Sequence, residues 1–435
     1  MKKMAAITSL ILSLVFFTAC QGNVEQQKDA SQTAGSTSSK KPVEITFWYA
    51  YGGNLGKASE ELVKQFNAEQ NEVKVTAQFQ GADYNALQAK LQAAVVAKNA
   101  PDVTVIENLA TGPFAKSGIL QDLTGFIQKD KVDLNDFVPV MLGNSYVNNK
   151  FYSFPYLRST NMLYFNATML KEAGLDPAGP KTWDELSEYA HKLNVPGKRS
   201  GITAVVDYTR FESFVKEAGG SMLSDDGKQV SFNSPEGVAA LEFWMKLNRD
   251  KVADLPYAEN SADIVKQNFM NQRAAMFIQS SSWITTLTDA FQQAGAELGA
   301  TLMPAKVSQG STSLGSNIAM LAHLPQDKQE AAWKFMKWMT DTKQTVTSSI
   351  ITGYQPTRHS AINSQEMQDV FKKNHLFKVA SDQMELASPR PMELAYYEIG
   401  KIVNTEIQKA LQDPSYTPKA ALDEAAKKSN AILKK

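Results

Sequence analysis

Apolar and polar positions follow a regular order between residues 44 and 107. Residues 44–49 and 103–107 are rich in strand formers, and residues 73–79 alternate apolar with polar positions, as half-buried strands do. Between these runs, apolar residues recur at three- and four-residue spacing, and Asp83 stands where a helix N-cap is expected. The two helical faces consist of Leu55, Ala58, Leu62, Val63 and Phe66, and of Leu87, Leu91, Ala94 and Val95. The order strand–helix–strand–helix–strand predicts an α/β fold with a parallel sheet.

A ligand is expected beyond the carboxyl ends of these strands, because open sheets of this kind bind ligands there. Residues 49–54 and Glu107 with Asn108 lie at such ends. A carboxylate such as Glu107 can orient a polyol by accepting hydrogen bonds, and aromatic faces can cover its C–H patches. The aromatic candidates are Tyr49, Tyr51, Tyr84, Trp283 and Tyr354. The structural alternatives are that Glu107 caps the following turn and that these aromatic residues belong to the core.

A second unit is predicted to start near Arg158. Residues 161–166 form a strand by pattern, and residues 167–173 form a helix. Thr182, with a glutamate three residues later, has the spacing of a capping box, which starts a helix. The chain from Met392 onward is largely helical by pattern, and no internal repeat is evident.

The N-terminus has the pattern of an export signal. Two lysines precede an apolar run from Met4 to Phe17, and Cys20, the only cysteine, follows directly after two small residues. This predicts a signal peptide at residues 1–19 and lipidation of Cys20. Residues 20–41 are polar and are predicted to form a lipidated flexible tether. The protein is then expected to be anchored to the cell membrane on its extracellular or periplasmic face. The alternative is an ordinary signal peptide with an incidental cysteine.

Composition narrows the classes of fold and function that remain open for this chain. About 390 residues follow the tether, more than one ordinary core accommodates, so two domains are expected. Without the two N-terminal lysines, 43 basic residues face 45 acidic ones, a net charge of −2 with no excess favouring nucleic acid. Four scattered histidines and a single thiol give little support to a transition-metal site. No later apolar run approaches the roughly 20 residues of a transmembrane helix.

Catalytic patterns are weak. A glycoside hydrolase needs two carboxylates across the scissile bond, and the sequence supplies no partner for Glu107. Gly310-Ser311 and Gly315-Ser316 do not form the G-x-S-x-G pattern of a serine hydrolase, and neither a P-loop nor a dinucleotide fingerprint opens a helix. We therefore expect no enzymatic activity and no cofactor. An adhesin or structural lipoprotein is the third class.

Several segments together resemble the extracellular solute-binding proteins of ABC importers, in the group that binds carbohydrates and glycerol phosphates. The segments are ITFWYAYGG, LVKQFNAEQNEVKV, AKNAPDVTVIE, FPYLRSTNMLYFN, KEAGLDP with PKTWDEL, FMNQRAAMFIQSSSW and ITGYQPTRHSAI. The resemblance implies an α/β two-lobe periplasmic-binding-protein-like fold, with a hinge and a ligand cleft between the lobes. The N-terminal lobe is expected at 42–157 and 320–352, and the C-terminal lobe at 158–319 and 353–435. Partners would be a small-molecule ligand, a permease pair and its ATPase.

Within this family the nearest resemblance is to the sn-glycerol-3-phosphate-binding proteins of Ugp-type importers. It implies ligand contacts at Tyr84, Glu107, Ser159, Ser280, Gly315 and Tyr354. Arg158 and Trp283 join them as a phosphate donor and an aromatic face. The family's late arginine is missing, because the matching stretch contains Lys401 instead; Lys401 or Arg390 substitutes only with a shifted register. The expected ligand is glycerol-3-phosphate or a glycerophosphodiester, and a neutral sugar or oligosaccharide remains the alternative.

Overall fold

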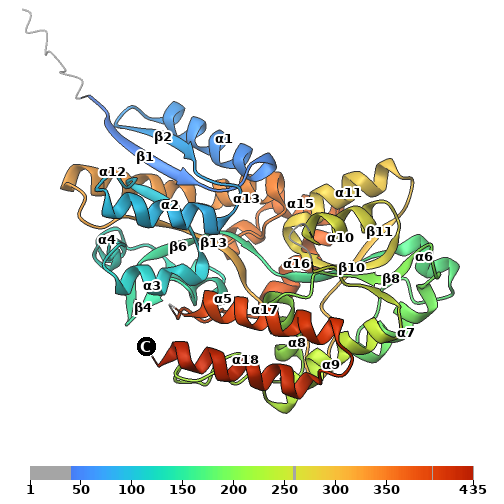
Figure 1. The fold of residues 1–435 in the computed structure, drawn as a ribbon. Helices are drawn as coiled ribbons and strands as arrows, with labels where there is room; N and C mark the ends of the chain where they lie inside the picture. The colour runs from blue at the N-terminus through green and yellow to red at the C-terminus, as the bar shows by residue number, and fades with distance from the viewer. Residues whose placement is uncertain (1–40, 258–260, 394, 435) are drawn as a thin grey trace, which may run out of the picture. The chain divides into compact units, whose positions relative to one another are not determined.

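The computed structural model describes residues 41–257, 261–393 and 395–434. The predicted signal peptide, Cys20 and the predicted tether up to residue 40 lie outside the described residues. Residues 42–435 form one compact unit, which is built around two five-stranded sheets (Figure 1). None of the helices in the described ranges is long and apolar enough to cross a membrane.

The first sheet has the strand order β2-β1-β3-β13-β6. Its strands are β2 (Val73–Phe79), β1 (Val43–Tyr49), β3 (Val103–Glu107), β13 (Leu314–Met320) and β6 (Ser153–Ser159). β1 pairs in parallel with β2 and β3, as the sequence predicts. β13 runs antiparallel between β3 and β6, so a strand from late in the chain completes this sheet.

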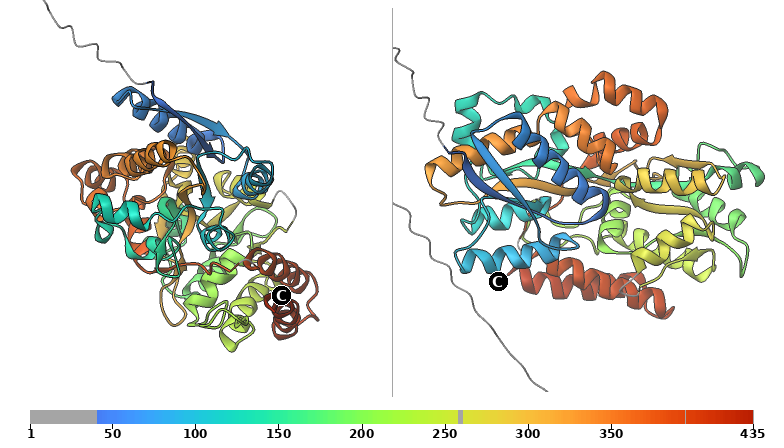
Figure 2. Two further views of the ribbon diagram at one scale, coloured as in Figure 1. Left: turned by 90° about the vertical axis from the view of Figure 1, so that its left-hand side faces the viewer. Right: turned by 90° about the horizontal axis from the view of Figure 1, so that it is seen from above.

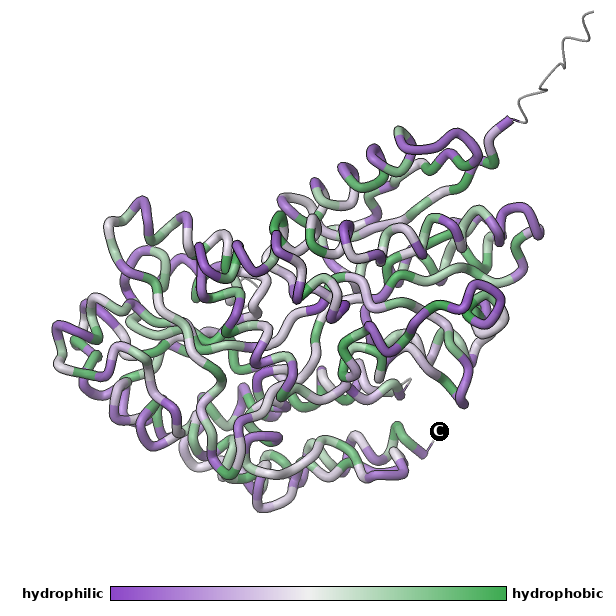
Figure 3. The backbone as a smooth tube through the Cα atoms, turned by 180° about the vertical axis from the view of Figure 1, so that it is seen from behind, coloured by the Kyte–Doolittle hydropathy of each residue, from purple (hydrophilic) through white to green (hydrophobic). Residues whose placement is uncertain are grey.

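Helices cover this sheet because their apolar faces pack against the apolar side chains of its strands. α1 (Gly53–Glu69) and α12 (Gln326–Met339) pack their buried residues against β1 and β2, where Phe66 and Phe335 meet edge to face at 5.2 Å. Asp83 caps α2 (Tyr84–Val96) by accepting from the Ala86 amide at 2.7 Å. Apolar stretches run along the central strands, whereas polar stretches lie on outer helix turns (Figure 3).

The second sheet has the order β11-β7-β10-β8-β9. Its strands are β11 (Leu298–Thr301), β7 (Asn161–Asn166), β10 (Ala274–Ser280), β8 (Ser200–Thr203) and β9 (Ala253–Asp254). β10 is antiparallel to β7 and parallel to β8. The predicted strand at 161–166 is confirmed.

The capping box predicted at Thr182 is confirmed in part. The Thr182 hydroxyl accepts from the Glu185 amide at 3.1 Å, but the Glu185 carboxylate accepts from Lys181, one residue before the cap. The helix that follows, α7 (Trp183–Leu193), buries Trp183 against the second core. The predicted C-terminal helices are also present, as α17 (Tyr396–Gln412) and α18 (Pro418–Leu433), which pack side by side (Figures 1 and 2).

The other elements are short or lie around these layers. The helices are α3 (Thr111–Lys116), α4 (Thr124–Asp130), α5 (Pro139–Leu142), α6 (Ala167–Glu172), α8 (Tyr208–Glu217), α9 (Pro235–Arg249), α10 (Ser261–Met270), α11 (Ile284–Gln293), α13 (Thr342–Thr352), α14 (His359–Ile362), α15 (Gln365–Lys373) and α16 (Leu376–Glu385). Short strands are β4 (Tyr146–Val147), β5 (Lys150–Phe151), β12 (Ser311–Thr312) and β14 (Ala387–Ser388). Single 3-10 turns occupy Asn108–Ala110, Leu134–Asp136 and Ser281–Trp283.

The strand pairing corrects two of the predicted lobe boundaries. The boundary at 157/158 cuts β6, and the boundary at 319/320 cuts β13, although both strands belong entirely to the first sheet. Main-chain hydrogen bonds decide this assignment, since β13 pairs with β3 from Ser316 to Met320. The chain therefore leaves the first sheet at Thr160 and returns to it after Ser313.

Candidate ligand-binding site

A cavity of about 620 Å³ lies between residues of the first and second sheets. Its volume falls in the range of small-molecule sites. Predicted ligand residues that line it are Tyr84, Glu107, Ser159, Ser280, Trp283, Gly315 and Tyr354. Residues from the β1–α1 connection, from the start of α8 and from the C-terminal segment also line it. The sequence therefore predicted residues that the fold gathers around one cavity.

Strand ends and helix starts position these side chains. Glu107 is the last residue of β3 and pairs with Ser316 of β13, so its carboxylate lies at the carboxyl edge of the first sheet. Ser280 ends β10, and its hydroxyl accepts from the Ser282 amide at 3.3 Å. Tyr84 begins α2, directly after the cap residue. The cavity thus forms where parallel strands end, as expected for an open sheet.

Aromatic residues form one wall of the cavity. Tyr51 and Tyr84 meet edge to face with ring centroids 4.9 Å apart. Burial raises the pKa of Tyr51, Tyr84 and Tyr354, so their hydroxyls stay neutral. Trp283 lines the cavity too, and the Lys266 ammonium lies 5.0 Å from its ring centroid. Neutral phenols and ring faces suit hydroxyl-bearing ligands.

Tyr49 does not belong to this wall, contrary to the sequence-based expectation. It is 4% exposed and packs in the first core beside Phe47. Its hydroxyl donates to Glu60 on α1 at 2.5 Å. The strand period explains the difference, since alternate residues of β1 face the core and Tyr49 lies in phase with Phe47.

Arg158 is the predicted ligand residue that does not line the cavity. Its side chain is fully buried, and Nη2 donates to the Ser313 hydroxyl at 2.8 Å while Nη1 donates to Asn317 Oδ1 at 3.3 Å. An acidic residue across the hinge is the structural alternative for Arg158, but none of the ion pairs among the described residues involves Arg158. Burial lowers the pKa of Arg158 to about 9. Arg158 therefore ties the two segments that connect the sheets.

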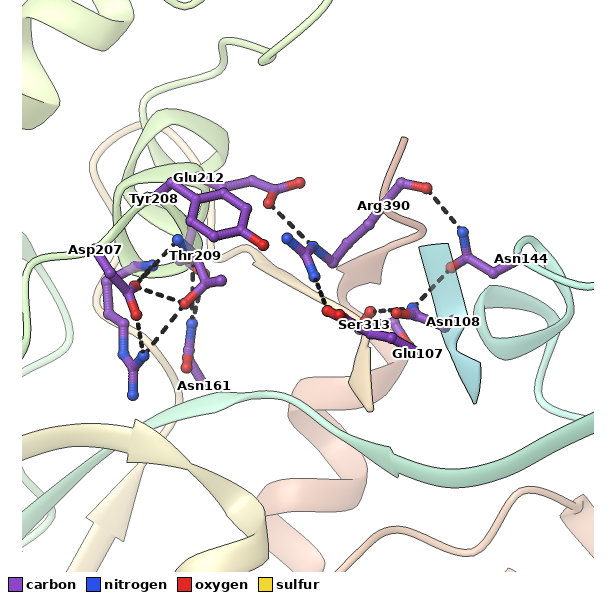
Figure 4. A network of polar contacts seen from close by, with 12 residues as sticks. Glu107, Asn108, Asn144, Asn161, Asp207, Tyr208, Thr209, Glu212, Ser313 and Arg390 are labelled. Atoms are coloured by element: carbon purple, nitrogen blue, oxygen red, sulfur yellow. Dashed lines mark hydrogen bonds and ion pairs between the residues drawn. The ribbon is translucent and has the colours of Figure 1, made fainter. Parts of the chain in front are cut away.

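Arg390 reaches the cavity instead. It follows β14 on a segment that lies against the first sheet's helices, where Asn144 Nδ2 donates to its carbonyl at 2.8 Å. Nη1 donates to Glu107 Oε1 at 2.9 Å, and Nε donates to Glu212 Oε2 at 3.3 Å (Figure 4). Nη2 is buried and makes no hydrogen bond. The rings of Tyr208 and Tyr396 lie 5.1 and 5.7 Å from the guanidinium carbon.

Glu107 accepts a second donor from the other side. The hydroxyl of Tyr397, on α17, donates to its Oε2, and Gln88 Nε2 on α2 donates to the same hydroxyl at 2.9 Å. Both Glu107 oxygens therefore hold a protein donor. The Glu107 carboxylate therefore links Arg390 to Tyr397 at the edge of the cavity.

A second ion pair lines the cavity at the start of α8. Asp207 caps this helix and accepts from Arg210 Nη1 at 2.7 Å. Arg210 Nη2 also donates to Gln279 on β10. The two arginines that line the cavity are thus both engaged by carboxylates.

Gly315 allows the chain to enter β13. Its φ is +104°, a region that other residues rarely adopt, and a Cβ atom there would lie 2.0 Å from the Leu157 carbonyl oxygen. The close approach lets β13 pair with β6 at the rim of the cavity. This position needs glycine for structural reasons beside any ligand contact.

Several residues of the site were missed in the sequence, namely Glu212, Arg210, Asp207 and Tyr397. Asp207 carried a local signal, because it stands before a helical run as an N-cap does. Glu212 and Tyr397 had none, since their partners lie 178 and 290 positions away. Arg210 pairs locally with Asp207, but its contact with Gln279 spans 69 positions. Among the described residues no group of His, Cys, Asp and Glu could hold a metal ion.

Known proteins similar to this chain are binding proteins. The sn-glycerol-3-phosphate-binding periplasmic protein UgpB of Escherichia coli K12 is 27% identical over 414 residues, covering 90% of this chain and 92% of that protein. The structure of UgpB from Mycobacterium tuberculosis in complex with glycerophosphocholine has a TM-score of 0.81 at 24% identity, covering 90% of this chain and 98% of that one.

The cyclic α-maltosyl-1,6-maltose binding protein of Arthrobacter globiformis has a TM-score of 0.77 at 25% identity, covering 90% of this chain and 99% of that one. These similarities confirm the expected two-lobe α/β solute-binding fold. A family model described as bacterial extracellular solute-binding protein matches residues 61–378, most of the chain. The chain therefore belongs to the bacterial extracellular solute-binding proteins.

Proposed function

We propose that this protein is the binding component of an ABC importer, and that it captures glycerol-3-phosphate or a glycerophosphodiester. The observation that best supports this ligand class is the position of Arg390. The buried guanidinium lines the cavity, and its Nη2 has no protein acceptor. A phosphate oxygen is a strong acceptor for such a donor. The similarity to the UgpB proteins supports the same ligand class.

Other groups of the cavity complete a site for a phosphorylated polyol. The hydroxyls of Ser159, Ser280 and Tyr354 supply neutral donors around the phosphate. Glu107 can exchange its tyrosine donor for a glycerol hydroxyl, because a carboxylate accepts several hydrogen bonds. The ring faces of Tyr51 and Tyr84 cover the carbon backbone of the ligand.

Capture follows from the two-sheet architecture. A ligand that contacts residues from both sheets binds more tightly when these approach, so its binding energy shifts the hinge equilibrium toward closure. The segments at Thr160 and Ser313 are the hinge in this proposal. The closed form then delivers the ligand to a permease pair, and a separate ATPase supplies the energy. No catalytic step and no cofactor enter this function.

A neutral sugar or oligosaccharide is the second candidate. The charges of the cavity favour it, since Arg390 already faces Glu107 and Glu212 and Arg210 already faces Asp207. The similarity to a maltosyl-maltose binding protein points the same way. A saccharide would use the same hydroxyl acceptors and ring faces.

Isothermal titration calorimetry with three ligands distinguishes the phosphate ligand from the neutral saccharide. Glycerol-3-phosphate, glycerophosphocholine and maltotriose are titrated into the wild type and into Arg390→Ala. The phosphate proposal expects binding of at least one phosphate compound and a severe loss in the variant. If maltotriose binds at micromolar level and neither phosphate compound gives a heat of binding, the phosphate proposal is wrong and a saccharide is the ligand.

We further propose that the mature protein is held at the membrane by a lipid on Cys20. The support is the sequence pattern alone, because these residues lie outside the described ranges. The extracellular assignment of the family agrees with export. A tether of about 20 residues would leave the binding unit free to meet a permease.

A further inference from the structure

Glu212 lies behind the cavity and does not line it. It belongs to α8, and its side chain is 2% exposed. Its Oε2 accepts from Arg390 Nε at 3.3 Å, on the far side of the guanidinium from the cavity residue Glu107 (Figure 4). Burial raises the pKa of Glu212, and the adjacent guanidinium opposes that rise. Arg390 is therefore held between two carboxylates.

The buried charges around this guanidinium cancel. Arg390 and Arg158 are the cations, and the burial of Arg158 together with repulsion from Arg390 lowers its pKa. Glu107 and Glu212 are the anions. Lys216, one turn after Glu212, is half-exposed and largely screened by solvent. The separate pair of Arg210 with Asp207 adds no net charge to the cavity.

We propose that Glu212 determines ligand specificity: its counter-charge on Arg390 makes the cavity favour a monoanionic phosphodiester over a dianionic phosphomonoester. The proposal rests on the phosphate ligand class proposed above. It assigns a selectivity role to a residue that the ligand does not touch.

Ligand charge supplies the physical reason. A phosphomonoester carries about −1.5 to −2 charges at pH 7, because its second pKa is about 6. A phosphodiester has lost that second ionisable group and carries about −1. In a neutral cavity the extra negative charge of the monoester has no partner, and Glu212 repels it through a partly buried environment where screening is weak. Removing the charge of Glu212 leaves the buried cluster with one positive charge and favours the monoester.

The test is the ratio of dissociation constants for glycerol-3-phosphate and glycerophosphoglycerol, a monoanionic diester without a cationic head group, measured by calorimetry. Glu212→Gln keeps the size and an oxygen acceptor for Arg390 but removes the charge. The ratio should fall about tenfold in this variant, as expected for a unit charge several ångströms away. Glu212→Ala removes the charge and the acceptor together, so it should shift the ratio similarly while weakening both ligands, because Arg390 loses its orientation.

Glu217→Gln is the matched control. Glu217 lies on the same helix and is also buried, but it accepts from Trp183 Nε1 at 2.7 Å and does not line the cavity. Burial raises the pKa of Glu217 well above its usual range. Its carboxylate pairs with Trp183 and not with Arg390, so Glu217→Gln should leave the ratio unchanged. Thermal melts of all variants show whether each is folded.

The outcomes separate this inference from the proposed function. If the wild type binds a phosphate compound and Glu212→Gln leaves the ratio within twofold, the counter-charge role is wrong and the ligand class stands. If the wild type binds only maltotriose and Glu212→Gln gains binding of glycerol-3-phosphate, the ligand class is wrong and the counter-charge role stands. If neither protein binds a phosphate compound, both are overturned.

Discussion

The hydroxyl of Tyr397 on α17 donates to Glu107 at the end of β3, 290 positions earlier in the chain. Gln88 on α2 donates to the same hydroxyl. One phenol thus joins α17 to the carboxyl edge of the first sheet, beside the ligand cavity. Its contribution to stability can be measured directly.

Tyr397→Phe should lower the free energy of unfolding by about 1–3 kcal/mol, because the half-buried carboxylate of Glu107 loses a donor. Urea denaturation followed by circular dichroism measures it. Tyr416→Phe is the control: its hydroxyl donates to Glu406 at 2.9 Å away from the cavity. Glu406 keeps its ion pairs with Lys409 and Lys428 in this variant, so the control should lose less. Equal stability of Tyr397→Phe and wild type would contradict the role of this phenol.

Ser280→Ala and Tyr354→Phe should each weaken ligand binding by roughly 1–3 kcal/mol with little loss of stability, since both hydroxyls belong to residues that line the cavity. Calorimetry with whichever compound binds in the three-ligand titration provides the comparison. Ser415→Ala, whose hydroxyl donates to Asp413 in a surface turn, should leave affinity unchanged. Unaltered affinity in both cavity variants would show that the ligand binds elsewhere.

Gly315→Ala should be strongly destabilising, because the added Cβ would lie 2.0 Å from a backbone oxygen at a φ of +104°. Gly118→Ala separates the two causes, since Gly118 has φ +70° and no atom within 4 Å of its added Cβ. The control should lose about 1 kcal/mol from backbone strain alone. Thermal melts of both variants measure the loss of stability. A similar loss in each would show that the steric clash at Gly315 contributes nothing.

Asp136→Asn should destabilise the protein at neutral pH and much less in acid. Burial raises the pKa of Asp136, but hydrogen bonds from Ser360 and pairing with Arg358 at 3.1 Å outweigh it, so the net pKa is lowered. Such a carboxylate stabilises the fold above its unfolded pKa of about 4 and loses this effect as pH falls through the lower folded value. Urea titrations at pH 7 and below pH 3 should therefore give a difference of about 1–3 kcal/mol only at pH 7. The same difference at both values would refute the ion-pair explanation.

Cys20→Ser should release the protein from membranes or leave its signal uncleaved. The lone thiol follows an apolar export pattern, and acylation requires it. Membrane fractionation with palmitate labelling makes the comparison. A variant that remains anchored and processed like wild type would disprove lipidation.

Local pattern was enough for three strands of the first sheet and for β7 of the second. The predicted strands at 73–79, 103–107 and 161–166 have the bounds observed, because each is a short run of strand formers between clear turn signals. The parallel pairing of β1 with β2 and β3 followed from the intervening helices. The family resemblance predicted six of the residues that line the cavity, and the search for aromatic faces added Trp283 as a seventh.

What escaped prediction depends on contacts far apart in sequence. β13 was placed in the wrong lobe because its run of Gly, Ser and Asn carries no sign of its partners β3 and β6. Arg158 was expected to reach the ligand and Arg390 only with a shifted register, whereas Arg390 lines the cavity and Arg158 does not. Which guanidinium reaches the cavity depends on the segment after β14, which is held by contacts distant in sequence such as the hydrogen bond from Asn144 to the Arg390 carbonyl.

The place of β13 also sets the order in which the chain can fold. Between the end of β6 and the start of β13, residues 160–313 must be made, roughly 8–30 s of synthesis. During that interval β3 and β6 have no strand between them, and each presents an unpaired edge. For a chain that begins with the predicted export signal, this is the time in which it can be threaded across a membrane before its first sheet closes.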